Sequence, residues 1–248
     1  MLKMQQDLNK TFMAILALPA TALGFALSVQ IVALTWILST RYNLNVHDIG
    51  LVWAAGPIAG IFGQVIIGIW SDKVWLWNGR RLPFILVGGT IAALMLLALP
   101  NIGVSSSALG FDGILGVALV VVLSLDFAIN VGFNPTRSII ADVTPEGIDR
   151  TRGYTWMQTV SGSFGVLASL IGAYFGNLFL IYTGAVLVLV FSIIPPFLIK
   201  EPKELRNEND AAPPAKNSLK DMLMAIQPLW GFLVYDIYAM TLRLAGIE

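Results

Sequence analysis

The sequence predicts an all-helical protein that crosses a membrane several times, and three observations support this fold class. Of its 248 residues, 56% are hydrophobic and 12% are charged, whereas a soluble domain carries about 25% charged residues. Apolar runs long enough to cross a bilayer recur along the chain. Basic residues collect in every second connection between these runs. The expected spans are residues 11–38, 49–70, 82–99, 114–140, 154–174 and 178–199, with a seventh from 228 to 248.

The first apolar run is interpreted as a retained span and not as a signal peptide. Lys3 and Lys10 precede it, as basic residues precede a signal. However, no charged residue occurs from Thr11 to Thr40, and the apolar region of a signal is only about 7–15 residues long.

The distribution of basic residues predicts how the spans are oriented. Cytoplasmic loops of membrane proteins carry an excess of lysine and arginine, and here the connections after the first, third and fifth spans hold only Arg41. The N-terminus and the other connections are therefore expected in the cytoplasm, with the spans in a plasma membrane or a bacterial inner membrane. The basic residues on that side are Lys3, Lys10, Lys73, Arg80, Arg81, Arg150, Arg152, Lys200, Lys203, Arg206, Lys216 and Lys220.

Three regions are expected along the chain. Residues 1–200 form a bundle of six transmembrane helices. Residues 201–217 form a cytoplasmic linker, because alternating charges and prolines prevent a continuous helix there. Residues 218–248 form an interfacial helix and a seventh span, which has no partner helices in this chain and is interpreted as the start of a truncated second bundle.

Composition excludes several classes of function. Basic and acidic residues number 15 each, so the chain offers no excess charge for a nucleic acid. With no cysteine and one histidine, His47, it lacks a cysteine nucleophile and a thiolate or histidine-rich metal site. Phosphate-binding glycine loops and zinc-protease motifs are also absent from the sequence. We expect no enzyme activity, no metal and no cofactor.

Residues 114–140 hold the strongest candidate site. A carboxylate such as Asp126 in the middle of a lipid-spanning helix costs about 2.5–3.5 kcal/mol on insertion scales. At about 100° per residue, Arg137 shares a helix face with Asp126 but lies about 16 Å further along the axis. Asn130 lies between them on the same face. This polar stripe is expected to line a cavity and not to face lipid.

Each of the two charged residues has two interpretations. Asp126 is either a buried, hydrogen-bonded carboxylate that specifies helix packing or a group that binds and releases a proton in a solute transporter. Arg137 is either an interfacial residue that extends its charge towards water or a permanent cation that stabilises a nearby carboxylate.

Other polar and aromatic side chains could join the same cavity. Hydroxyl-rich ligands are bound by amides, carboxylates and aromatic faces, which Gln30, Gln64, Trp156 and Gln158 could supply together with Asp126. Alternatively, each amide bonds only to a neighbouring helix. Pairs of small residues four apart, such as those at positions 56 and 60, are expected to let helices approach closely.

The sequence Gly68-Ile-Trp-Ser-Asp72-Lys73, followed by Gly79-Arg80-Arg81, resembles the cytoplasmic signature between the second and third spans of the major facilitator superfamily. Five residues, 74–78, separate its two parts, and this spacing resembles the sucrose-transporter branch, with its plant symporters and their animal and bacterial relatives. Similar segments are IGLVWAAGPIAGIFGQVIIGIWSDK, RRLPFILVGG, LDFAINVGFNPTRSIIADV and YTWMQ.

The resemblance implies a fold of two six-helix bundles, each made of two inverted three-helix repeats, with substrate bound between the bundles. This chain would supply the N-terminal bundle and need the C-terminal bundle as its partner. The implied function is proton-coupled symport of a disaccharide, such as sucrose or maltose, by alternating access. The alternatives are a non-transporting membrane sensor built on the same bundle and a facilitator for another small solute.

The resemblance also implies residue roles. Asp126 would serve proton coupling and sugar contact, and Arg137 would serve coupling. Asn130, Gln30, Trp156 and Gln158 are expected to contact sugar. The cytoplasmic gate would contain Gly68, Asp72, Lys73, Gly79, Arg80, Arg81 and Asp142.

Overall fold

A computed structural model describes residues 5, 7–76, 79–104 and 113–202, and for residues 65, 66 and 68–73 it describes the backbone alone. The chain divides into two units, Met1–Glu204 and Leu205–Glu248. The predicted interfacial helix, the seventh span and most of the predicted linker lie outside the described residues.

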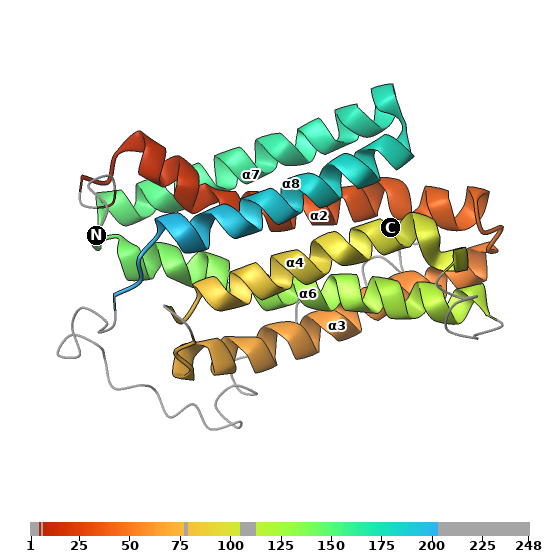
Figure 1. Ribbon diagram of the computed structural model, residues 1–248, viewed down its shortest axis with the longest axis horizontal. Coiled ribbons are helices and arrows are strands. Elements are labelled where there is room, and N and C mark those ends of the chain that lie inside the picture. Colours follow the sequence, from red (N-terminus) through yellow and green to blue (C-terminus); the bar gives the residue numbers. More distant parts are fainter. Residues whose placement is uncertain (1–4, 6, 77–78, 105–112, 203–248) are drawn as a thin grey trace, which may run out of the picture. The chain divides into compact units, whose positions relative to one another are not determined.

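The described part of the first unit is built from long helices, and all six predicted spans within it are helical (Figure 1). A short 3-10 turn, η1 (Leu99–Asn101), extends the third of them. The helices are α2 (Lys10–Thr40), α3 (Val46–Lys73), α4 (Leu82–Ala98), α6 (Ile114–Val143), α7 (Ile148–Phe175) and α8 (Asn177–Leu198).

Five described helical segments are long and apolar enough to cross a membrane, and they include all of α2, α6 and α8. The other two are Val46–Gln64 of α3 and Leu82–Val104, which contains α4. Helix α7 has 28 residues, about 42 Å at 1.5 Å per residue, so it has the length of a span. Its composition is more polar, because residues such as Thr155, Gln158, Thr159 and Ser163 interrupt its apolar surface.

The helix contacts follow an internal symmetry. Helix α2 packs along α7 and α8, whereas α6 packs along α3 and α4, and α4 also packs on α8 (Figure 1). Exchanging α2, α3 and α4 for α6, α7 and α8 maps these pairs onto one another. Each set of three crosses the membrane an odd number of times, so the second set begins on the opposite side. This is the pair of inverted three-helix repeats that the resemblance implies.

Helix α2 supplies much of the core. Phe25, Leu34 and Ile37 on α2 are fully buried, and they belong to a cluster that includes residues of α3, α4, α6, α7 and α8. Glycine allows α4 and α6 to approach closely, since a Cβ added at Gly88 would lie 2.9 Å from the Ala128 carbonyl oxygen. The bundle is therefore packed closely around the helices that carry the polar residues.

Candidate functional site

Asp126 lies on α6 where three helices meet, and it is 7% exposed. Gln30 of α2 donates from Nε2 to both carboxylate oxygens, at 3.0 and 3.1 Å. On the α3 side lies Gly56, where an added Cβ would be 3.1 Å from Asp126 Oδ2. The structure thus brings together two of the predicted site residues, which lie 96 positions apart in the sequence and on different helices.

The polar stripe continues along the seam between α3 and α6. Asn130 donates from Nδ2 to the backbone carbonyl of Asp126 at 2.8 Å and accepts at Oδ1 from Gln64 Nε2 at 2.7 Å. One turn further, Asn134 Nδ2 donates to the Gln64 carbonyl at 2.9 Å. Asn134 was absent from the predicted site, although its spacing of four residues from Asn130 is the signal that could have identified it.

Glycines on α3 make room for this stripe. A Cβ added at Gly63 would lie 2.9 Å from the Asn130 Cβ, and Gly60 also faces the Asn130 amide. The small-residue spacing predicted to permit close packing is therefore used here, at positions 56, 60 and 63, to bring the α3 backbone against the polar face of α6.

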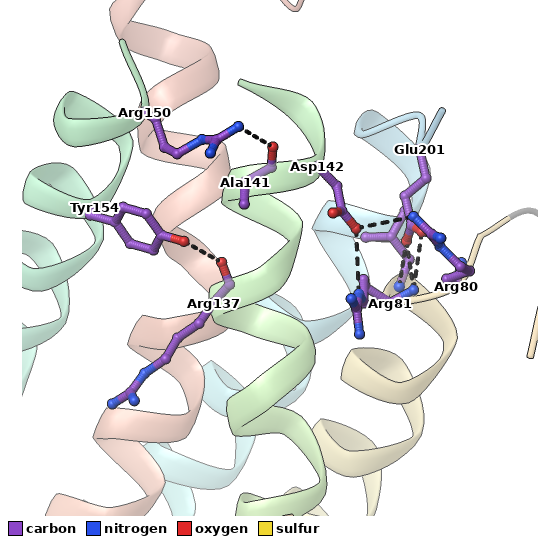
Figure 2. A network of polar contacts seen from close by, with 9 residues as sticks. Arg80, Arg81, Arg137, Ala141, Asp142, Arg150, Tyr154 and Glu201 are labelled. Atoms are coloured by element: carbon purple, nitrogen blue, oxygen red, sulfur yellow. Dashed lines mark hydrogen bonds and ion pairs between the residues drawn. The ribbon is translucent and has the colours of Figure 1, made fainter. Parts of the chain in front are cut away.

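Arg137 lies on the exposed surface of α6 and is separate from Asp126, as its spacing predicted. Its guanidinium lies 5.9 Å from the centre of the Phe133 ring. Its backbone carbonyl accepts a hydrogen bond from the Tyr154 hydroxyl at 3.2 Å. Figure 2 shows its side chain directed away from Asp142 and the neighbouring arginines. Within the described part of the chain, no ion pair involves this guanidinium.

The two predicted sugar-binding residues of α7, Trp156 and Gln158, do not join the cluster around Asp126. Trp156 lines a surface depression near the start of α7, together with Thr151, Arg152 and Thr155. Gln158 is exposed. Among the described residues, no hydrogen bond joins either of them to the Asp126 cluster, so the structure does not bring these parts of the predicted site together.

A second polar cluster forms where α4 begins and α6 ends (Figure 2). Asp142 Oδ2 of α6 lies 3.4 Å from Arg81 Nε and 3.5 Å from Arg80 Nη2. The Glu201 carboxylate, just after α8, accepts from the backbone N–H of Arg80 at 2.6 Å, of Arg81 at 2.9 Å and of Leu82 at 2.7 Å. The first N–H groups of a helix lack intrahelical acceptors and carry partial positive charge, so this carboxylate complements the start of α4.

Gly79 lets the Glu201 carboxylate approach the chain. A Cβ added at Gly79 would lie 2.6 Å from Glu201 Oε1. The turn before α4 is closed by two backbone hydrogen bonds, from Leu76 to Gly79 at 3.0 Å and from Gly79 to Leu76 at 3.1 Å. Glu201 was absent from the predicted site. It is the first residue of the predicted linker, and it is held against the bundle with 8% of its surface exposed.

Four of the predicted gate residues therefore meet at this cluster, namely Gly79, Arg80, Arg81 and Asp142. The other three, Gly68, Asp72 and Lys73, belong to the last turns of α3, where the structure describes only the backbone.

Comparison with known proteins identifies the family of this chain. The Major Facilitator Superfamily matches residues 16–247. The General alpha-glucoside permease of Schizosaccharomyces pombe is 29% identical over 178 residues, which make up 66% of this chain and 31% of that protein. Proton-associated sugar transporter A of Mus musculus is 33% identical over 123 residues, 46% of this chain and 16% of that protein. Sucrose transport protein SUC3 of Arabidopsis thaliana is 31% identical over 137 residues, 50% of this chain and 23% of that protein.

The chain thus spans less than a third of each of these relatives. The predicted resemblance to the superfamily and its sucrose-transporter branch is confirmed, and the long apolar helices make the protein an integral membrane protein. The family match covers most of the chain, and the six helices form two symmetry-related sets of three, so the chain belongs to the major facilitator superfamily.

Proposed function

We propose that this chain is the N-terminal bundle of a proton-coupled symporter for a disaccharide such as sucrose or maltose, working by alternating access. The observation that carries the proposal is Asp126, a carboxylate 7% exposed near the middle of an apolar helix. Gln30, a neutral amide, is its side-chain partner. Such a carboxylate is costly to keep out of water without a countercharge, and binding a proton or further hydrogen-bond donors relieves that cost.

The neighbouring groups suit a sugar. Asn130 and Gln64 form a chain of amides beside Asp126 that reaches the surface, where Gln64 is exposed. Sugar hydroxyls both donate and accept hydrogen bonds, as these amides do. Relatives whose names include sugar, sucrose or alpha-glucoside transport support the same substrate class. In this proposal Arg137 contributes a permanent positive charge, and Trp156 and Gln158 contact the sugar in the complete protein.

The cluster of Arg80, Arg81 and Asp142 supports a role at the cytoplasmic gate. It joins the end of α6 to the start of α4, and basic residues in this connection favour a cytoplasmic location. We place the N-terminus and the linker on the same side. The partner is a second six-helix bundle, which closes the sugar site from the opposite side.

The test is Asp126→Asn in the full-length protein, reconstituted in liposomes. Asparagine keeps the shape of the side chain but cannot exchange a proton. We expect loss of sugar accumulation against a gradient, with sugar exchange between the two sides retained. Asp149→Asn is the matched control, because the Asp149 carboxylate lies at the start of α7, 3.4 Å from Arg152.

If Asp126→Asn accumulates sugar as well as the unsubstituted protein does, the coupling role of Asp126 is refuted. Sugar binding without any flux by the unsubstituted protein would instead support the sensor, which uses the same bundle without transport.

A further inference from the structure

Gln30 is the hydrogen-bonding partner of the Asp126 side chain, but only half of its amide is used. Both side chains are buried, with Gln30 1% exposed. Nε2 of Gln30 lies almost equally far from the two carboxylate oxygens, at 3.0 and 3.1 Å. Its Oε1 is buried and has no hydrogen-bond partner among the residues that the structure describes. A buried acceptor without a donor is costly, so this oxygen points to a second bonding arrangement in which it is used.

Asp126 is remote from other charges in the helices packed on α6. Helices α2 after Lys10 and α4 contain no ionisable side chain, and the ionisable residues of α3, α6 and α7 lie towards their ends. Arg137 is about 16 Å further along α6 at 1.5 Å per residue. Gln30 is therefore the described group best placed to respond to the charge of Asp126. The other ionisable residues of α3, α6 and α7 are His47, Asp48, Asp72, Lys73, Asp142, Asp149, Arg150, Arg152, Tyr154 and Tyr174.

An amide can bond to a carboxyl group in either protonation state. An ionised carboxylate only accepts, which suits the Nε2–H donor seen here, whereas a protonated carboxyl also donates an O–H. The last torsion of a glutamine side chain is soft and roughly two-fold, so rotation about it can bring Oε1 to that proton while Nε2 stays with the other oxygen.

We propose that Gln30 is a positioning residue that adapts its amide to the protonation of Asp126, so that the proton adds an O–H donor to the hydrogen bonding between α2 and α6. Protonation uses the otherwise unpartnered Oε1, and deprotonation returns the pair to the single-donor arrangement. Because α2 and α6 begin the two inverted repeats, the proton changes how firmly these repeats are joined. This inference rests on the proposed symport, and it assigns to Gln30 a part in coupling in place of the contact with sugar that the sequence led us to expect.

The test compares Gln30→Met and Gln30→Glu in the full-length protein. Methionine keeps the length and apolar packing but offers neither the amide donor nor its oxygen acceptor. We expect the number of protons taken up per sugar to fall, because losing a hydrogen bond to a charged group weakens an equilibrium about tenfold or more, while sugar exchange persists. A protonated glutamate has one donor and one acceptor like the amide, so Gln30→Glu should regain coupling as the pH falls. Gln30→Met should not regain it.

Three results would overturn the inference. One is a normal ratio of protons to sugar in Gln30→Met. Another is an equal loss of coupling and exchange in that variant, which would indicate a structural role. If Gln30→Met does not fold, the third result is a number of protons per sugar in Gln30→Glu that does not change with pH, which would also overturn the inference. A lack of coupling in the unsubstituted protein would instead refute the proposed symport itself. Failure of the symport proposal can therefore be distinguished from failure of the role given to Gln30.

Discussion

Removing the Glu201 carboxylate should destabilise the start of α4. In the structure this carboxylate accepts from the backbone N–H groups of three successive residues, Arg80, Arg81 and Leu82. Glu201→Ala removes all of these acceptors at once. Because Glu201 is 8% exposed, water can replace only some of the lost hydrogen bonds.

The expected loss of stability follows from the number of backbone N–H groups that lose their acceptor. A buried donor left without a partner costs about 1–3 kcal/mol, and loss of a helix N-terminal cap costs about 0.5–2 kcal/mol. With partial access of water, we expect Glu201→Ala to lower the free energy of unfolding by about 2–4 kcal/mol in total. Glu201→Gln keeps one acceptor oxygen but loses the negative charge that favours a helix N-terminus, so its cost should be smaller, about 1–2 kcal/mol.

The assay is denaturant unfolding of the full-length protein in detergent, followed by tryptophan fluorescence. Glu146→Ala is the matched control, because the Glu146 side chain is 87% exposed and its ion pair in the described part of the chain is with Arg150, one turn away. Exposed ion pairs of this kind contribute little. A Glu201→Ala variant no less stable than Glu146→Ala would contradict a capping role for this carboxylate, as would equal stability of the alanine and glutamine variants at position 201.

Two further predictions concern α6 and its neighbours. Gly63→Ala should cost about 1–3 kcal/mol of stability, because its Cβ would lie 2.9 Å from the Asn130 Cβ, whereas Gly50→Ala, with nothing within 4 Å, should be neutral or stabilising in the same unfolding assay. Asp142→Ala removes the carboxylate of α6 that pairs with the two arginines just before α4. It should slow sugar exchange several-fold while leaving sugar affinity in a binding assay nearly unchanged, and a loss confined to affinity would contradict a gate role.

The sequence predicted the helices well because hydropathy reports what lies in the bilayer, but it placed their ends less well. The second span was expected at residues 49–70, whereas α3 runs from Val46 to Lys73. The fourth was expected at residues 114–140, whereas α6 ends at Val143. The helical turns that lay outside the predicted spans are polar and contain charged residues. A search for apolar runs therefore does not find them, although their backbone hydrogen bonds continue the helix.

Within one helix, the candidate site was also predictable. The fixed rotation per residue places Asp126 and Asn130 on one face, and the structure finds both along the α3 seam. Spacing could not reveal which residues of other helices meet this face. Gln30 was a candidate from its residue type alone, and Glu201 was missed because its partners lie about 120 positions away.

Helix α6 joins the two polar clusters. Asp126 lies near its middle and Asp142 near its end, 16 residues apart or about 24 Å at 1.5 Å per residue. A helix of this length is stiff, so a displacement of α6 at the first carboxylate is carried to the second unless the helix bends between them. Pro135 lies in that interval, and proline removes one backbone hydrogen bond and favours a kink at its position. Whether movement at Asp126 reaches Arg80 and Arg81, just before α4, therefore depends on how far α6 bends at Pro135, whose ring is buried within the bundle.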